Sequence, residues 1–157
     1  MLNIAKKLIE NEEFEKAQEI LLPILNENPD DAEGNHYFAE TFDAQSLERE
    51  AIPYYENALA NNIKGELREA AYVQLGSSYR CIGEYKKAEE ILTKGLEEFP
   101  DNSAMRAFLA MVLYNLDEGK DAVTKLLQTL AESTDDPWLK NYERAIKFYA
   151  ENLDETW

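Results

Sequence analysis

Apolar side chains recur along the chain at intervals of three and four residues, with charged side chains between them. Two successive stretches show this spacing: Tyr72, Leu75, Gly76 and Tyr79, then Ala88, Ile91, Leu92 and Leu96. Such a period predicts helices that each bury one face. A strand would instead alternate apolar and polar residues, and no sustained alternation is present. The pattern therefore predicts an all-α protein.

The predicted helices are organised as a repeat. Four similar short motifs end in Ala17, Ala51, Ala88 and Ala122, which are separated by 34, 37 and 34 residues. A large apolar or aromatic residue follows four positions after each alanine: Leu21, Tyr55, Leu92 and Leu126. A Pro-Asp pair at 29–30 returns at 100–101, which is 71 residues later and in the same register. Each repeat is long enough for two helices, so a helix pair is the predicted unit.

Several residues mark the ends of these helices. Asp31, Asp101 and Asp136 are predicted N-caps, because a side-chain oxygen can accept from the free N–H groups of a first turn. Pro137 follows Asp136 at a position where its missing N–H has no cost. The turn inside the third pair carries Gly83 and Glu84.

The third repeat resembles a known family. It reads Tyr72-x2-Leu75-Gly76-x2-Tyr79, then Ala88-x3-Leu92, then Pro100. This is similar to the tetratricopeptide repeat (TPR), whose pattern is W-x2-L-G-x2-Y, A-x3-F and P over about 34 residues. The complete chain resembles small stand-alone bacterial TPR proteins. The resemblance implies an α-solenoid of antiparallel helix pairs.

The repeat register sets the expected domain organisation. We predict one domain over residues 1–157, with units at about 1–29, 30–64, 67–101 and 102–134. A capping helix at 136–154 is expected to cover the last unit, because terminal repeats need a cover for their open face. Its apolar period contains Trp138, Tyr142, Ala145, Ile146, Tyr149 and Leu153.

The resemblance also implies a binding groove, because in this family the first helix of each pair builds a concave wall. Three rows beside the buried faces are then expected to line the groove: His36, Glu40 and Asp43; Val73, Ser77 and Arg80; Ala107, Met111 and Tyr114. The rows change from acidic, through one arginine, to apolar. They predict a protein or peptide ligand with a basic segment and an apolar anchor, the latter held by Met111 and Tyr114.

Charge narrows the class of partner. The chain has 32 Asp and Glu against 16 Lys and Arg, a formal net charge of −16. Nucleic acids and anionic membranes favour basic surfaces, so we expect neither as a partner. The first residues do not resemble a signal peptide, and no apolar run approaches the roughly 20 residues of a membrane span. Together with a single cysteine, this predicts a cytoplasmic protein.

Little in the sequence favours catalysis. His36, Glu40 and Asp43 share a helix face and are candidate metal ligands, but a solvated acidic wall is the preferred interpretation, and we expect no metal, cofactor or enzyme activity. Cys81 beside Arg80 is interpreted as a small apolar filler in preference to a redox thiol. Arg80 is expected to pair with Asp43 in preference to contacting a ligand anion. The terminal Trp157 has three alternatives: folding back, fraying or contacting another copy.

The predicted function is a non-catalytic adaptor that binds a protein or peptide in the groove. The alternative is self-association without another ligand, through the groove or through an open N-terminal face at Leu2, Ile4 and Leu8. A homodimer would be the simplest product.

Overall fold

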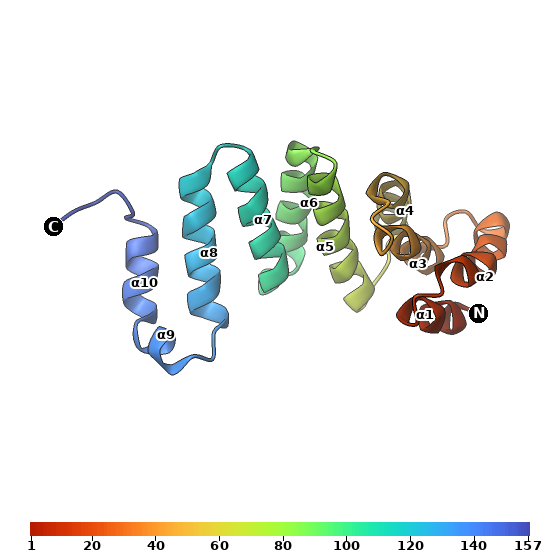
Figure 1. Cartoon of the computed structure of the whole chain (residues 1–157), viewed down its shortest axis with the longest axis horizontal. Helices are drawn as coiled ribbons and strands as arrows, with labels where there is room; N and C mark the ends of the chain where they lie inside the picture. Colours follow the sequence, from red (N-terminus) through yellow and green to blue (C-terminus); the bar gives the residue numbers. More distant parts are fainter. The chain divides into compact units, whose positions relative to one another are not determined.

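The computed structural model describes residues 1–157 and contains ten α-helices (Figure 1). Their bounds are α1 Leu2–Glu10, α2 Phe14–Glu27, α3 Ala32–Asp43, α4 Glu48–Ala60, α5 Gly65–Cys81, α6 Tyr85–Glu98, α7 Ser103–Asn115, α8 Gly119–Ser133, α9 Pro137–Asn141 and α10 Glu143–Ala150. The prediction of an all-α fold is confirmed. No helix combines the length and the hydrophobicity needed to cross a membrane.

The helices form two compact units, Met1–Glu84 and Tyr85–Trp157. In the first unit α1 packs against α2, α3 against α4, and α5 against both α3 and α4. In the second unit α7 packs against α6 and α8, and α10 packs against α8. Apart from α8 and α9, helices adjacent in sequence are thus neighbours in space within each unit. The division into four repeats and a cap within one domain stays a prediction.

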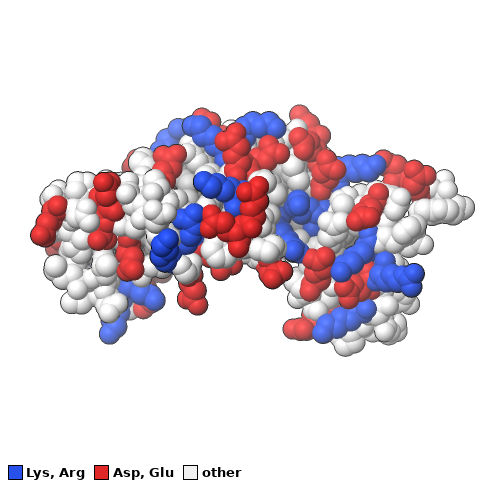
Figure 2. Space-filling model, turned by 180° about the vertical axis from the view of Figure 1, so that it is seen from behind, with Lys and Arg blue, Asp and Glu red and all other residues white.

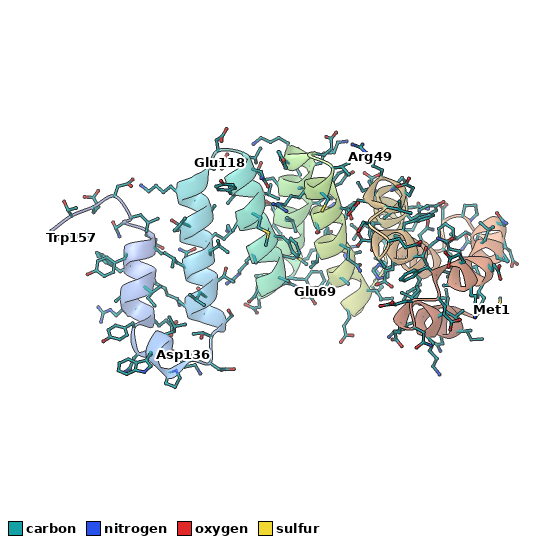
Figure 3. The ribbon with its side chains drawn as sticks, in the orientation of Figure 1. Met1, Arg49, Glu69, Glu118, Asp136 and Trp157 are labelled. Carbon is teal, nitrogen blue, oxygen red and sulfur yellow. The ribbon has the colours of Figure 1, made fainter.

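Two of the three predicted N-cap residues, Asp31 and Asp136, are confirmed. Asp31 Oδ1 accepts from the backbone N–H of Gly34 at 2.7 Å, and Asp136 Oδ1 accepts from Trp138 and Leu139 at 2.9 and 3.0 Å. Pro137 occupies the first turn of α9, and Figure 3 marks Asp136 just before that helix. The prediction for Asp101 is wrong, because Asn102 caps α7 and accepts from the N–H of Met105 at 2.8 Å.

The turn within each helix pair has one repeated geometry. The residues Glu12, Ser46, Gly83 and Asp117 all have a positive φ, between 59° and 83°. The next residue in each turn, such as Glu84, donates its N–H to the carbonyl five residues earlier, at 2.8 to 3.0 Å. This is the Schellman helix end, in which a left-handed residue lets the chain satisfy two terminal carbonyls. The four positions repeat the 34, 37 and 34 spacing of the alanines.

Replacing Ser46 with glycine is expected to raise the free energy of unfolding by about 0.5–1 kcal/mol, because glycine adopts a positive φ without the steric cost of a side chain. Gly83→Ala is expected to lower the free energy of unfolding by about 1 kcal/mol. Because no atom lies within 4 Å of the added Cβ, this effect comes from backbone conformation and not from a steric clash. Asp117→Gly should give a smaller gain, because aspartate tolerates this conformation. Urea unfolding of the three variants tests this order, and a gain for Gly83→Ala would contradict it.

The alanines of the repeat lie in the core, as their spacing predicts. Ala17, Ala51 and Ala88 are fully buried, and Ala122 is nearly so. Three of the residues four positions later, Leu21, Tyr55 and Leu92, are also fully buried. Leu126 differs and is 44% exposed. Its helix, α8, packs against α10 rather than against another full helix pair, so less of its apolar stripe is covered.

The C-terminal segment differs from the single capping helix that the sequence predicts. The chain bends at Tyr142 between the short helices α9 and α10. Contact with α8 is made through the buried Ala150, whose carbonyl accepts from Thr124 Oγ1 at 2.6 Å. Of the predicted apolar face, Trp138, Tyr142, Tyr149 and Leu153 are exposed. The helical period is present there, but of that face only Ile146 is partly covered, one turn before the buried Ala150.

The last residue folds back onto α10. The Trp157 ring centroid lies 5.6 Å from those of Phe148 and Tyr149. Figure 3 marks Trp157 at the end of the segment that follows α10. Of the three alternatives for this residue, the structure shows folding back.

Candidate functional site

The first candidate surface belongs to α3 and α5, which pack against each other and against α4 within the first unit. Residues three or four apart on a helix share a face, so α3 groups His36, Glu40 and Asp43, while α5 groups Val73, Ser77 and Arg80. All six belong to the predicted groove lining. Figure 2 shows acidic and basic side chains interspersed over the face of the molecule that it presents.

His36 lies beneath this surface. Its side chain is fully buried, and its ring centroid lies 5.6 and 5.7 Å from those of Tyr37 and Tyr55. The exposed position that the sequence predicts for His36 is therefore not found. The physical reason is that α1, α2, α4 and α5 all contact α3, so most of this helix is buried and little of it faces solvent.

Glu40 contacts the buried His36 and is itself partly exposed to solvent. Its Oε1 accepts from Gln74 Nε2 at 3.1 Å and lies 3.4 Å from His36 Nε2. Its side chain keeps 24% of its accessible surface. Burial raises the pKa of the Glu40 carboxyl, but the contacts with His36 and Gln74 outweigh this and hold the pKa below its usual value. Glu40 is therefore ionised at neutral pH.

Asp43 is one helical turn from Glu40 and accepts two hydroxyl donors. Tyr55 donates to Oδ2 at 3.1 Å and Ser78 donates to Oδ1 at 3.3 Å. Burial raises the pKa of Asp43, and these two hydrogen bonds offset only part of that effect. These two hydroxyl groups are the donors that the structure gives Asp43, and the expected Arg80–Asp43 pair stays a prediction.

The second candidate surface belongs to α7 in the second unit. Tyr114 is 71% exposed and Met111 is 39% exposed, and their spacing of three places them on one face. Ala107, one turn earlier, is half-buried. In the first unit, Val73, Ser77 and Arg80 are also half-buried. Met111 and Tyr114 thus present apolar surface to solvent, as an anchor site requires.

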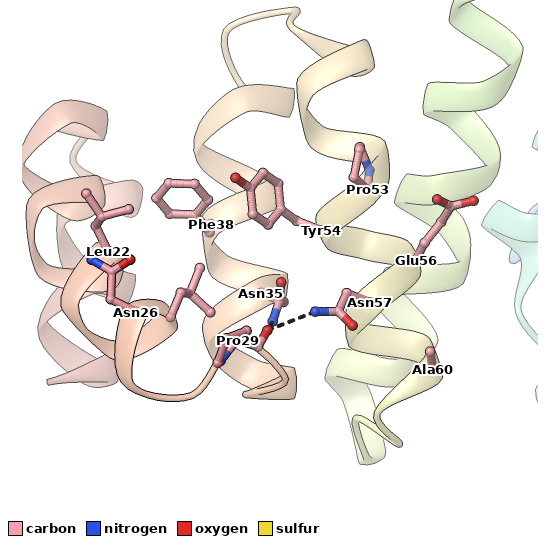
Figure 4. A pocket seen from close by; sticks show the side chains of 11 residues that line it. Leu22, Asn26, Pro29, Asn35, Phe38, Pro53, Tyr54, Glu56, Asn57 and Ala60 are labelled. Carbon is pink, nitrogen blue, oxygen red and sulfur yellow. Dashed lines mark hydrogen bonds between the residues drawn. The ribbon is translucent and has the colours of Figure 1, made fainter.

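A cavity of about 800 Å³ in the first unit was not predicted from the sequence (Figure 4). It lies among α2, α3 and α4, and its lining includes Leu22, Phe38, Pro53 and Tyr54. At one end the side-chain amides of Asn35 and Asn57 both donate to the carbonyl of Pro29, at 2.8 and 2.9 Å. Leu22 is a large apolar residue that lies outside the repeat's buried positions, and it is half-exposed. Its place in the sequence was the only signal that could have indicated this cavity.

The remaining candidates from the sequence are Cys81 and the residues considered as metal ligands. No group of three or more His, Cys, Asp and Glu side chains is placed to hold a metal ion. Cys81 is exposed at the last residue of α5, so its interpretation as a small apolar filler is wrong.

Comparison with known proteins identifies the family. Residues 36–153 match the family model described as the tetratrico peptide repeat, which is most of the chain. The protein therefore belongs to the tetratricopeptide repeat family, as its third repeat indicates. No curated protein matches the sequence closely enough to be a relative.

Among solved structures, the chain is similar to YrrB, described as a TPR protein with an unusual peptide-binding site. The similarity covers 99% of this chain and 90% of that one, with a TM-score of 0.66 and 16% sequence identity. At this identity the similarity establishes the fold.

Proposed function

We propose that the protein is a non-catalytic adaptor that binds a peptide or protein segment on the surfaces of its first helices. The observation that carries the proposal is the pair formed by Tyr114 and Met111 on α7. An exposed aromatic ring next to an adaptable thioether is typical of the anchors on which peptide binding depends. The TPR family supports this class of function, and the peptide-binding site of YrrB gives a further parallel.

Each unit is assigned one kind of contact. In the second unit Met111 and Tyr114 bind an apolar side chain, and in the first unit the acidic residues of α3 attract a basic segment. The first unit has 7 Lys and Arg against 17 Asp and Glu, so it attracts a basic segment more strongly than the second unit, which has 9 against 15.

The double variant Met111→Ala, Tyr114→Ala is expected to weaken ligand binding at least tenfold without unfolding the protein, because both side chains are exposed in the free chain. The ligands are peptides selected by the wild-type protein from a random display library, and fluorescence anisotropy gives their dissociation constants. The matched control is Val123→Ala, Leu126→Ala, which truncates two exposed side chains on α8 of the same unit. Equal losses in both double variants would contradict the proposed surface.

A second candidate function is self-association. It is favoured by exposed apolar side chains at both ends of the chain, including Ile4, Trp138 and Phe148. Sedimentation velocity over a range of concentrations distinguishes it from a monomeric adaptor. A dimer that forms equally well in the Met111, Tyr114 double variant would favour association through another surface.

A further inference from the structure

Within the first unit, one polar cluster is not fully satisfied by the chain's own side chains. We call it the α3–α5 site and define it by Glu40 and Asp43 of α3, Gln74 and Ser78 of α5, and the underlying His36. Tyr55 of α4 borders the site and donates a hydrogen bond to Asp43. The cluster lies wholly within the compact unit Met1–Glu84.

Neither carboxylate in this site forms an ion pair with a Lys or Arg side chain, and the one basic group in contact is His36, whose Nε2 lies 3.4 Å from Glu40 Oε1. The donors to Glu40 and Asp43 are an amide and two hydroxyl groups. An ionised carboxylate has about four acceptor positions. The site therefore keeps unused acceptors, and no Lys or Arg side chain is paired with its two carboxylates, although both side chains are partly withdrawn from water.

Buried polar atoms beside the carboxylates provide a second observation. Neither ring nitrogen of the fully buried His36 makes a hydrogen bond, and the Oε1 atom of Gln74 is buried without a partner. His36 points to the site, since its Nε2 is 3.4 Å from Glu40 Oε1. Unpaired buried polar atoms are rare and each costs free energy, so their concentration at one point indicates a site completed by a ligand.

We propose that the α3–α5 site binds a cationic side chain, the guanidinium or ammonium group of a basic residue in the bound segment. This inference rests on the proposed adaptor function and names the chemistry of one contact. Residues three apart on a helix lie on one face, so a single cation can approach Glu40 and Asp43 together. It supplies the positive charge and the N–H donors that the site lacks.

A guanidinium group fits this arrangement better than an ammonium group. It has five N–H donors in a planar fork and reaches two carboxylates at once, and it is less strongly hydrated than an ammonium group. Rotation of the Gln74 amide about its last side-chain bond would turn Oε1 toward the incoming donors. The expected order of affinity is therefore arginine, then lysine, with no binding of a neutral side chain of the same shape.

The direct test uses single blocked amino acids and the full chain labelled with ¹⁵N. N-acetylarginine amide should shift the Gln74 side-chain amide and the backbone signals near residues 40–43 in a saturable manner. N-acetyllysine amide should bind more weakly. N-acetylcitrulline amide has nearly the shape of arginine but no charge, and should leave these signals unchanged. Equal shifts from citrulline would overturn the inference.

Variants distinguish binding at this site from the general attraction of an acidic protein for a cation. Glu40→Gln keeps an acceptor for Gln74 and should weaken binding of N-acetylarginine amide at least tenfold. Glu33→Gln removes the same charge from an exposed position on α3 and should change binding less than twofold. Similar losses in both would overturn the inference. Asp43→Asn replaces Glu40→Gln as the test if the latter does not give a folded spectrum.

The same experiments distinguish this inference from the proposed function. Selected peptides that depend on Met111 and Tyr114 but contain no excess of arginine or lysine would overturn the α3–α5 cation site and leave the adaptor function intact. Selected peptides rich in basic residues whose binding falls with Glu40→Gln, but not with Glu33→Gln, would support both.

Discussion

Replacing Tyr55 with alanine is expected to lower the free energy of unfolding by about 3–5 kcal/mol, because a large buried aromatic side chain leaves a cavity that the surrounding helices fill only in part. Tyr55 is fully buried on α4, with its ring next to that of His36. Its hydroxyl also donates to Asp43 at 3.1 Å. The substitution therefore removes both packing and one donor to a partly buried carboxylate.

Chemical unfolding followed by circular dichroism measures this effect. Tyr55→Phe isolates the hydroxyl and is expected to cost about 1–3 kcal/mol, since it leaves Asp43 one donor short. Tyr114→Ala is the control for loss of an exposed tyrosine and should change stability by less than about 0.5 kcal/mol. A similar effect for Tyr55→Ala and Tyr114→Ala would show that Tyr55 is not a core residue.

The second large effect is expected from Leu92→Ala, which should lower the free energy of unfolding by about 2–5 kcal/mol. Leu92 is fully buried on α6, four residues after the buried Ala88. Its removal takes apolar surface from the core of the second unit and leaves a space between helices. Thermal and urea unfolding of the variant measure the loss.

Leu126→Ala is a sharp control, because it makes the same chemical change at the equivalent position of the next repeat, in the same unit. Leu126 is 44% exposed, so its truncation should cost less than about 1 kcal/mol. Comparable losses in the two variants would indicate that the repeat register alone, and not the coverage of each helix, determines what is buried.

The contrast between Leu92 and Leu126 also shows how far the sequence predicts the fold. The spacing of alanines correctly predicted helices and their small buried positions, because that spacing follows from helix geometry. It could not predict which apolar stripe each neighbour covers. The same reason explains the C-terminal segment, where the periodic Trp138, Tyr142 and Tyr149 are exposed while Ala150 makes the buried contact.

The candidate site was predicted in part. The sequence predicts that Glu40 and Asp43 share one face of a helix, because they lie three residues apart in the same helix. It did not predict that Tyr55 and Ser78 donate to Asp43, or that His36 is buried, since these contacts depend on how α3, α4 and α5 are packed. Side-chain partners across helices require the register between elements, which a single sequence does not contain.

The Schellman turns have a consequence for the speed of folding. Each reverses the chain within a few residues, so contacts such as those between α1 and α2, α3 and α4, and α7 and α8 join segments that are close in sequence. Proteins whose contacts are mainly local have a low contact order and lose little chain entropy before contacts form, and they fold in microseconds to milliseconds. We therefore expect each helix pair to form early in folding, with its turn bringing the two helices together.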